Sequence, residues 1–522
     1  MPGINNPTEA GSAASPQASV GARVVRGGLS MLFGQTAVLA ASFLATPFTI
    51  RLLGTEGYGL LSLILVVIDY LSFSDLGMGF GSTRFATRAH AQGDERGEVE
   101  SIGTAFIIVL ASVGLIILVV AAIAPLIFIR GFNVPWHQAG IAGWALRLAL
   151  LGMAARLLAF VINTPLLVRL KLEVQAHIYS ISAVLQVLAT PIVLFALHGG
   201  VVTAVAVASL GGLLFFFGTW WFARRALPSL RLFAWNPRLV GPLLRFGAGI
   251  SLTSLVGVAL TSFEKLAIGR YADLKALAYY TVAFRIATLV AVGPRGMMGT
   301  LLPAFGQLWY RNARTELAQL YHSVFRGTLL WIVPVAGGLS IFGGPLLRLW
   351  IGGEQAGRAL LPLQILLLGV VIELVTHVPT ELIKSLGRTD LLARIAIAEL
   401  PLYAVAAVLA VRHFGIVGAA YAWTLRAAVD WLLQSWMVRR ITKNALWPAN
   451  HPRGLWPLVI LFGGAFGAAA YLEVRMILAI PFSIVVFAIY VALVWRVILR
   501  LDEREWLRVR VQRFLPRAMR SA

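Results

Sequence analysis

Long apolar runs recur along almost the whole chain, and short segments rich in Arg, Gly and Pro separate them. About fourteen runs are each roughly 20–30 residues long, which as a helix is enough to cross the hydrocarbon core of a bilayer. The pattern therefore predicts an all-α integral membrane protein with about 14 transmembrane helices. We place the spans at 29–51, 57–83, 101–129, 139–167, 175–197, 200–223, 241–268, 277–306, 320–347, 359–383, 390–411, 415–438, 455–473 and 477–499.

The two ends of the chain differ from this pattern. Residues 1–22 are polar and small, as in NNPTEAGSAASPQ, and are predicted to be a disordered tail. Arg23 and Arg26 then precede the first apolar run, as in the basic region of a signal peptide. That run is longer than the apolar part of a typical signal peptide, so we interpret it as an uncleaved first span.

Composition supports the membrane class and narrows the chemistry. The chain is 59% hydrophobic and 13% charged, and its mean hydropathy is +0.82. It contains no Cys, which excludes disulfides, Cys-ligated zinc and thiol nucleophiles. The net charge of +22 would suggest nucleic acid in a soluble chain; here most Arg and Lys fall in alternate loops, as the positive-inside rule expects. Both termini are therefore predicted to be cytoplasmic.

A weak internal repeat organises the spans. HGGVVTAVAVA (His198–Ala208) matches HFGIVGAAYAW (His413–Trp423) at a spacing of 215, and LLGTEGYGLLSL (52–63) matches YADLKALAYYTV (271–282) at 219. Chance similarity between apolar segments is the alternative. A repeat of six spans gives both halves the same orientation, so it predicts two parallel-oriented six-helix lobes around a central cleft, plus two extra C-terminal helices. The predicted divisions are 1–22, 23–226, 227–450, 451–500 and 501–522.

Several motifs identify a family. Residues 28–95, with LLGTEGYGLLSL and SDLGMGFGSTRFATR, resemble the start of a polysaccharide transporter of the O-antigen flippase type. SFEKLAIGRYADLKALAYYTVAFRIATL is similar to its seventh-span region, and IKSLGRTDLLAR with HFGIVGAAYAWTLRAAVDW resembles its tenth to twelfth spans. The superfamily also contains multidrug antiporters and the lipid II flippase. The extra C-terminal pair resembles the fourteen-span members.

The resemblance implies a function. Such a flippase turns a polyprenyl-diphosphate-linked oligosaccharide, an O-antigen or exopolysaccharide repeat unit, from the cytoplasmic to the outer leaflet by alternating access. It implies a bacterial cytoplasmic (inner) membrane location, and a polysaccharide polymerase and glycosyltransferases as partners. An ion-coupled multidrug antiporter of the same superfamily is the alternative, and it would need an acid-lined cavity.

Seven basic residues fall inside the spans, where charges are costly and usually face a cavity. Because a diphosphate is anionic, we expect Arg285, Arg295, Arg147 and Lys265 to bind the head group. Arg147 and Arg156 lie nine residues apart, on opposite sides of one helix, and we favour Arg147 for the cleft. Snorkelling is the alternative for Arg326, and we expect Arg426 to be neutralised by Asp430 at i,i+4.

Helix-breaking residues accompany one of these cations in AVGPRGMMGT (291–300). Gly293, Pro294 and Gly296 are predicted to interrupt the eighth span and act as a hinge, as broken backbone is tolerated where it lines a cavity. The 219-residue repeat aligns Asp75 with Pro294 and Gly77 with Gly296, so the second span is expected to break at a similar depth. Close helix packing is the alternative for these glycines.

Acidic residues within the spans are candidates for gating or ion coupling. Asp69 and Asp75 lie on the span related by the repeat to the one that carries Arg285 and Arg295, so they are candidate gate partners; structural pairing and substrate contact both remain open. Glu373 and Glu399 are candidate proton or sodium sites, although Pro379 and Pro401 nearby also fit simple kinks.

Enzymatic readings find little support. The chain has no G-x-x-x-x-G-K-[ST] phosphate loop, no visible metal-ligand cluster and no long outer loop. We therefore expect a transporter without a cofactor, coupled at most to protons or sodium. Finally, 501–522 alternates apolar positions with Arg residues, which predicts a helix lying on anionic membrane lipid, with a disordered basic tail as the alternative.

Overall fold

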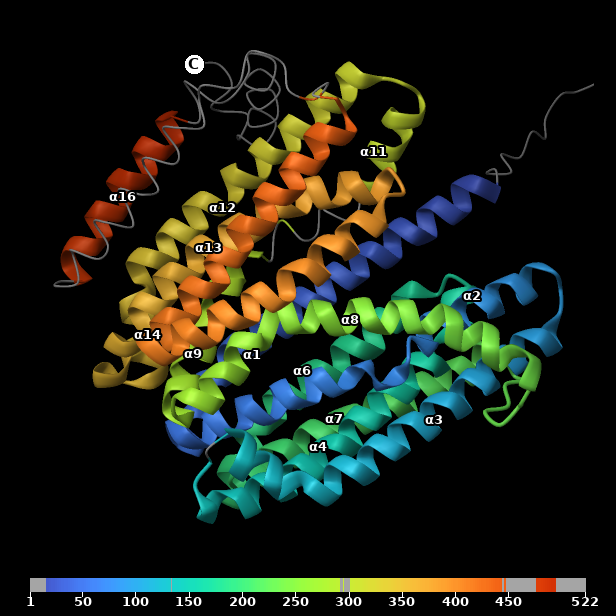
Figure 1. The fold of residues 1–522 in the computed structure, drawn as a ribbon, viewed down its shortest axis with the longest axis horizontal. Coiled ribbons are helices and arrows are strands. Elements are labelled where there is room, and N and C mark those ends of the chain that lie inside the picture. Colours follow the sequence, from blue (N-terminus) through green and yellow to red (C-terminus); the bar gives the residue numbers. More distant parts are fainter. Residues whose placement is uncertain are drawn as a thin grey trace, which may run out of the picture. The chain divides into compact units, whose positions relative to one another are not determined.

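All regular elements in the described part of the chain are helices (Figure 1). The computed structural model describes residues 16–132, 134–291, 294, 301–443, 446 and 476–493. Within these residues, ten helical segments are long and apolar enough to cross a membrane. The predicted all-α, multi-pass membrane fold is therefore confirmed.

Two of these segments are long enough for two crossings each, and each bends at a glycine. α1 (Pro16–Leu71) bends at Gly54, with φ 70° and ψ 167°, and α14 (Thr389–Ile441) bends at Gly415, with φ 58° and ψ −136°. Both conformations are open to glycine and strained for other residues. The bends fall where the sequence separates the first from the second span and the eleventh from the twelfth. The predicted span 455–473 lies outside the described residues.

The chain forms two compact units, which we call the first and the second unit. The first consists of 1–52, 67–126 and 137–255, and the second of 53–66, 127–136 and 256–522. The predicted lobe boundaries at 226 and 450 stay predictions. α8 (Pro237–Tyr271) contributes residues to both units. The other helices of the first unit are η1 (Ser72–Asp75), α2 (Met78–Ala91), α3 (Glu95–Leu126), α4 (Trp136–Ile162), α5 (Thr164–Val168), α6 (Leu172–Leu197) and α7 (Val201–Ala226).

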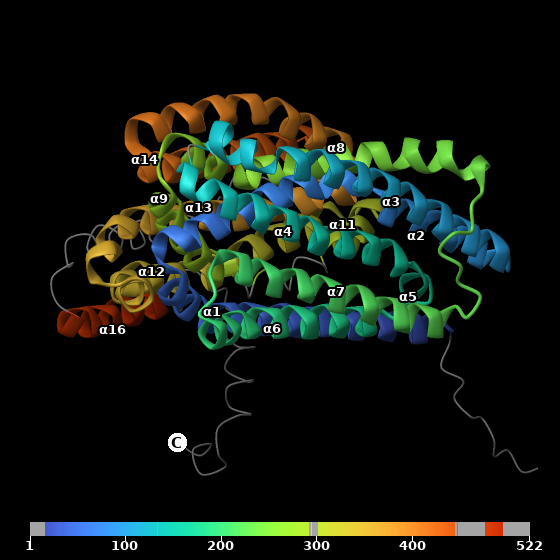
Figure 2. The same cartoon turned by 90° about the horizontal axis from the view of Figure 1, so that it is seen from below.

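Glycines allow three helices of the first unit to approach closely. A Cβ on Gly212 of α7 would lie 2.6 Å from the Gly152 carbonyl oxygen of α4, and one on Gly211 would lie 2.5 Å from Gln186 Oε1 of α6. The Ser209 hydroxyl also donates to the Leu148 carbonyl at 2.7 Å. The two adjacent glycines therefore fix α7 against α4 on one side and against α6 on the other (Figure 2).

A buried carboxylate joins the helix ends of the first unit. Glu98, at the start of α3, is 1% exposed and accepts from Arg169 Nη1 at 2.5 Å and Nη2 at 3.2 Å. His90 Nδ1 lies 3.1 Å from the other side of the same carboxylate. The Glu98 carboxylate thus links the end of α2 and the α5–α6 turn to the start of α3.

α13 (Gly353–Ser385) is the centre of the second unit. It packs against α12 (Arg314–Ile351) and α14 on its two sides, as Figure 1 shows, and against α9 (Leu274–Ala287). One apolar core joins α12, α13 and α14 to the helix Leu301–Tyr310 (α11) through Phe305, Tyr321, Leu382 and Val438. The remaining helices of this unit are the π-helical turn η2 (Ile127–Gly131), η3 (Thr288–Ala291), α11 (Leu301–Tyr310) and α16 (Met476–Leu493).

The close approach of α7 to α4 predicts a stability effect. Gly212→Ala should lower the thermal unfolding temperature of the purified protein in detergent by several degrees, since overpacking backbone against backbone costs about 1–3 kcal/mol. Gly140→Ala on α4, where a Cβ would meet no atom within 4 Å, is the matched control and should unfold like the wild type. Equal unfolding temperatures for both variants would contradict the packing argument.

Candidate functional site

The second predicted span breaks where the repeat suggested. α1 ends in the 3₁₀ turn Ser72–Asp75, and Leu76 and Gly77 follow with φ of 50° and 66° before α2 begins. Asp75 Oδ1 accepts from the Gly77 amide at 2.9 Å and so stabilises the turn. A Cβ on Gly77 would lie 2.6 Å from the Gly247 carbonyl oxygen of α8, so close packing also requires glycine here. The break therefore combines an Asx-type turn with a tight helix contact.

Asp69 lies one turn before this break, on the last part of α1 within the first unit. Its side chain is exposed, and its backbone carbonyl accepts from the Ser72 hydroxyl at 2.5 Å. Its carboxylate interacts electrostatically with Arg156 of α4. Asp69 and Asp75 thus occupy one short segment but differ in role: Asp75 holds the backbone turn, whereas Asp69 points a charge outward.

The two cations of α4 lie in different surroundings. Arg147 Nε donates to the Ala121 carbonyl of α3 at 3.0 Å, and its guanidinium stacks 4.9 Å from the ring of Trp144, which is 63% exposed. Arg156 is exposed, and its Nη2 donates to Gln186 Oε1 of α6 at 2.6 Å. The sequence placed them on opposite sides of the helix and favoured Arg147 for the cleft, but it is Arg156 that is exposed and bonded to a polar side chain.

In the second unit, Arg285 projects from α9 and is exposed. Its Nη1 lies 3.4 Å from the hydroxyl of buried Tyr58. The α-helical backbone changes to a 3₁₀ turn at Thr288, and helix α11 does not begin until Leu301, so the eighth predicted span is not one continuous α-helix. Pro294 is described as helical and buried. Arg295, Gly293 and Gly296 lie outside the described residues.

A buried acid and a phenol face each other between α8 and α14. Glu264 is fully buried, and its Oε2 accepts from the Tyr403 hydroxyl at 2.6 Å. The adjacent Lys265 turns away: its Nζ lies 4.2 Å from the ring centre of Phe284 and 3.5 Å from the Ser262 hydroxyl. The predicted head-group residue Lys265 is thus half-buried against an aromatic ring, next to a carboxylate.

Glu399 lies one turn before Tyr403, and it is 6% exposed. Within the described residues, neither of its carboxylate oxygens has a hydrogen-bond partner. Arg426 lies within electrostatic range of both Glu264 and Glu399, and it packs over the rings of Tyr403 and Trp423. The second unit therefore contains a buried acid–aromatic cluster, which we define as Glu264, Glu399, Tyr403, Trp423 and Arg426.

One expected ion pair is not formed. Asp430 Oδ1 accepts from Gln434 Nε2 at 2.7 Å, while Arg426 stacks on aromatic rings and its Nε has no partner in the described part of the chain. The prediction that Arg426 and Asp430 neutralise each other is therefore wrong. Arg426 and Gln434 both lie four residues from Asp430, and Gln434 is the one held in place, since its Oε1 accepts from Thr380 of α13 at 2.5 Å while Arg426 packs on the rings.

Glu373, the other predicted coupling acid, lies outside the buried acid–aromatic cluster. It lies half-buried on α13, and its backbone carbonyl hydrogen-bonds to His377 Nδ1 at 2.8 Å. This contact satisfies one ring nitrogen of His377 within its own helix, as in a packed histidine. The structure thus brings Glu399 into a polar cluster but leaves Glu373 in the helical surface of α13.

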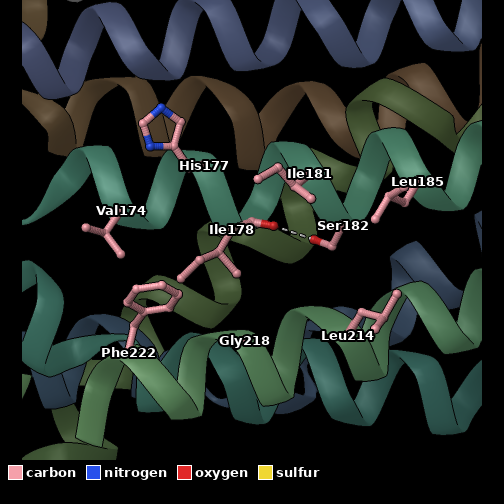
Figure 3. Close-up of a pocket in the computed structure, with 9 residues that line it drawn as sticks. All are labelled: Val174, His177, Ile178, Ile181, Ser182, Leu185, Leu214, Gly218 and Phe222. Carbon is pink, nitrogen blue, oxygen red and sulfur yellow. Dashed lines mark hydrogen bonds between the residues drawn. The ribbon is translucent and has the colours of Figure 1, made fainter. Parts of the chain in front are cut away.

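Two apolar grooves flank α6. One lies between α6 and α7, with a volume of about 390 Å³, and Figure 3 shows its side chains. His177 and Ser182 are its polar members, and the Ser182 hydroxyl is bonded to the Ile178 carbonyl at 2.6 Å. The other lies between α6 and α1, with about 690 Å³, and has Arg51 at one end. Both grooves offer hydrocarbon contacts rather than a polar binding site.

Sequence reasoning missed two groupings. Glu264 and Tyr403 are 139 residues apart, and Arg156 and Gln186 are 30 apart, so no local spacing links either pair. The sequence does show that Glu264 and Arg156 are charged residues inside predicted spans. Such residues need a polar neighbour or water, although the sequence does not say which neighbour.

Comparisons with known proteins agree with this architecture. A family model described as polysaccharide biosynthesis protein matches residues 24–309, more than half of the chain. A Shigella flexneri protein provisionally named an O-antigen transporter is 20% identical, and the match covers 80% of this chain and 98% of that protein.

Two solved structures share the fold. The lipid II flippase MurJ, in an inward closed conformation, matches with a TM-score of 0.67 and 13% identity over 92% of this chain and all of that one. An inward-facing multidrug resistance MATE family transporter of the MOP superfamily matches with a TM-score of 0.67 and 17% identity, covering 78% of this chain and 96% of its own. The chain therefore belongs to the polysaccharide biosynthesis protein family, and the named relative and the two solved structures that share its fold are transporters or flippases rather than enzymes.

Proposed function

We propose that this protein moves a polyprenyl-diphosphate-linked oligosaccharide, an O-antigen or exopolysaccharide repeat unit, from the cytoplasmic to the outer leaflet of the bacterial inner membrane. The observation that carries the proposal is the match to an O-antigen transporter along nearly its whole length, within a family of polysaccharide biosynthesis proteins. A sugar–diphosphate head group cannot cross hydrocarbon alone, because each unsatisfied polar group costs several kcal/mol. A protein that shelters the head while the lipid tail stays in the bilayer removes that barrier.

Cations are the natural partners of the diphosphate. Arg285 is exposed on α9, beside the hydroxyl of Tyr58, and Arg295 follows ten residues later in the sequence. We propose these two residues as the main diphosphate contacts, with Arg147 and Lys265 as secondary contacts. Arg147 and Lys265 are each half-buried against an aromatic ring, so they would need to rotate outward to reach a ligand.

Alternating access needs helices that bend at defined places. The break at Asp75–Gly77 aligns in the sequence repeat with Pro294 and Gly296, and the α-helix before Pro294 changes to a 3₁₀ turn at Thr288–Ala291. We propose that Gly77, Gly293, Pro294 and Gly296 act as hinges, and that Asp69 and Asp75 take part in gating. The Asp75–Gly77 hydrogen bond holds one conformation of the turn, so a change of backbone angles there must break it.

The buried acid–aromatic cluster is the best candidate for ion coupling. We propose that Glu399 binds the coupling proton, or else sodium, because its carboxylate is buried and has no hydrogen-bond donor among the described residues. A change in its charge would alter the forces on Arg426 and thus on α14. Glu373, which is less buried, is the second candidate.

The proposed function also implies an orientation in the membrane and partner proteins. We propose that both termini are cytoplasmic, that the basic segment 501–522 binds anionic lipid, and that a polymerase and glycosyltransferases act on the same substrate. The segment 501–522 lies outside the described residues.

A multidrug antiporter remains the second candidate, since the MATE transporter matches with the same TM-score as MurJ. The two functions separate in one strain: a deletion mutant of a flippase loses surface glycan, whereas a deletion mutant of a drug antiporter becomes sensitive to cationic drugs with its glycan unchanged.

Removing the two proposed diphosphate contacts should abolish export. The double variant Arg285→Ala/Arg295→Ala should lower surface glycan about a hundredfold or more, since charge-assisted hydrogen bonds contribute roughly 1.5–3 kcal/mol each. Glycan is measured on cells in which the variant replaces the wild type, with membrane insertion checked by blotting. Arg285→Lys/Arg295→Lys should keep partial export, and Arg130→Ala, at an exposed position on η2, should match the wild type. Normal glycan in the double alanine variant would refute the assignment.

Coupling can be tested in vesicles with defined gradients. An imposed pH gradient should accelerate substrate flipping by the wild type several-fold but leave Glu399→Gln unaffected, because Gln cannot exchange a proton. Glu381→Gln, at a side chain paired with Lys384 at 2.8 Å, is the control and should respond like the wild type. A response of the wild type to sodium alone would assign sodium instead, and an undiminished pH response in Glu399→Gln would remove Glu399 from the coupling path.

A further inference from the structure

Arg156 and Gln186 lie at mid-depth of the first unit. Gln186 is 14 residues from the start of α6 and 11 from its end, which places it about 21 and 16 Å from the two ends of the helix. The 2.6 Å hydrogen bond from Arg156 brings the guanidinium to the same depth. These distances are too long for an arginine to snorkel to either membrane surface.

The exposure of Arg156 then has one physical explanation. An exposed guanidinium at this depth faces either hydrocarbon or water, and contact with hydrocarbon costs several kcal/mol. Both of its hydrogen bonds start from Nη2, to Gln186 Oε1 and, at 3.4 Å, to the Ala208 carbonyl. Nε and Nη1 have no hydrogen-bond partner among the described residues. Water at this position would satisfy them, so a binding role for Arg156 requires that water reaches it.

The helix packing holds this pair in place. Gly211 of α7 leaves the space that the Gln186 side chain occupies, since a Cβ there would lie 2.5 Å from Oε1 and 2.8 Å from Cβ of Gln186. Gly152, one turn before Arg156 on α4, packs against Ser209 of α7 in the same way. Gln186 and Arg156 are therefore pre-oriented by two glycine contacts, as a binding site requires.

An aromatic ring completes the surface. Tyr179 lies seven residues before Gln186, hence on the same side of α6 and about 10 Å away. Its ring is 51% exposed and is held edge-on to Phe215 of α7, with centroids 6.0 Å apart. An exposed aromatic face next to a fixed amide and a guanidinium matches the chemistry of a sugar, which has apolar C–H faces and hydroxyl edges.

Electrostatics favours a sugar over a phosphate at this position. Asp69 is an acid within electrostatic range of Arg156. The hydrogen-bond partners of the guanidinium are neutral carbonyl oxygens. A single guanidinium with an acid in its range and neutral acceptors beside it suits hydroxyl groups, whereas a diphosphate favours several cations together.

We propose that Arg156, Gln186 and Tyr179 form a sugar-binding subsite in the first unit, which receives glycan hydroxyls and one ring face of the transported head group. The inference rests on the proposed flippase function and adds the residues that recognise the glycan. Arg156 and Gln186 bind hydroxyls, and Tyr179 stacks on a sugar ring.

Water access is tested first, and the absence of native cysteines makes the experiment direct. Single variants Arg156→Cys and Gln186→Cys in membrane vesicles should react with a charged methanethiosulfonate reagent at least about tenfold faster than Leu151→Cys and Leu188→Cys, which lie on exposed apolar faces of the same helices. Equal rates at all four positions would overturn the proposal, because the site would then not be aqueous.

Ligand protection identifies the group that binds. The lipid-linked oligosaccharide fraction purified from the source cells should slow labelling of Gln186→Cys several-fold, and synthetic undecaprenyl diphosphate without sugar should not. Equal protection by both would show that a phosphate, not a sugar, occupies the subsite. No protection by the glycosylated fraction would also overturn the proposal.

Transport distinguishes stacking from a merely structural role. Tyr179→Ala should lower the initial rate of glycan-lipid flipping in vesicles by about tenfold, while Tyr179→Phe, which keeps the ring, should retain most of the rate. Equal rates for the two variants would remove Tyr179 from the subsite. If the wild type moves no lipid-linked oligosaccharide at all, the proposed function fails, whereas the labelling and protection results still decide whether this surface binds sugar.

Discussion

The structure depends on one constraint, which is that charged and polar groups are costly in the low-dielectric interior of a membrane. Every backbone or side-chain polar group at membrane depth must be paired within the protein or face water. Four of the six described intramembrane cations are buried or half-buried: Arg147, Lys265, Arg326 and Arg426. Three of these four guanidinium or ammonium groups, those of Arg147, Lys265 and Arg426, pack against aromatic rings. The two exposed cations in the described part of the chain are Arg156 in the first unit and Arg285 in the second, so these are the two positions at which a ligand can reach a guanidinium.

The helical framework was largely predictable, because hydrophobic length and glycine placement act locally. In lipid, the backbone polar groups of a run of roughly 20–30 apolar residues are hydrogen-bonded only in a helix. The bend at Gly54 falls between two predicted spans, and the bend at Gly415 falls on the first residue of the predicted span 415–438. The break near Asp75 was predicted from the repeat alone. Asp75 aligns with the helix breaker Pro294, although the segment around Asp75 contains no proline. The length of α8 was less predictable, since its polar end at Pro237 extends beyond the apolar run.

The polar contacts were predictable only as a list of residues. Helical periodicity places Arg147 and Arg156 on opposite sides of α4, but it cannot say which side meets a neighbour, because this depends on how Gly152 and Gly212 pack. The pairing expected for Arg426 failed for a related reason. A competitor, Gln434, lay one turn from Asp430, and the aromatic rings that receive Arg426 include one from a distant part of the same helix. Tertiary packing, not spacing, chose the partner in both cases.

A fold shared by a lipid flippase and a drug antiporter cannot by itself assign the cargo, so the chemistry of each unit must. A cationic drug needs accessible carboxylates at mid-membrane. Glu264 and Glu399 are buried, Glu264 is bonded to Tyr403, and exposed Asp69 has the Arg156 guanidinium within electrostatic range. What remains accessible is a guanidinium, an amide and a phenol ring on one unit and Arg285 on the other. Donors without uncompensated carboxylates suit hydroxyls and phosphates, and these are the groups that a lipid-linked glycan carries.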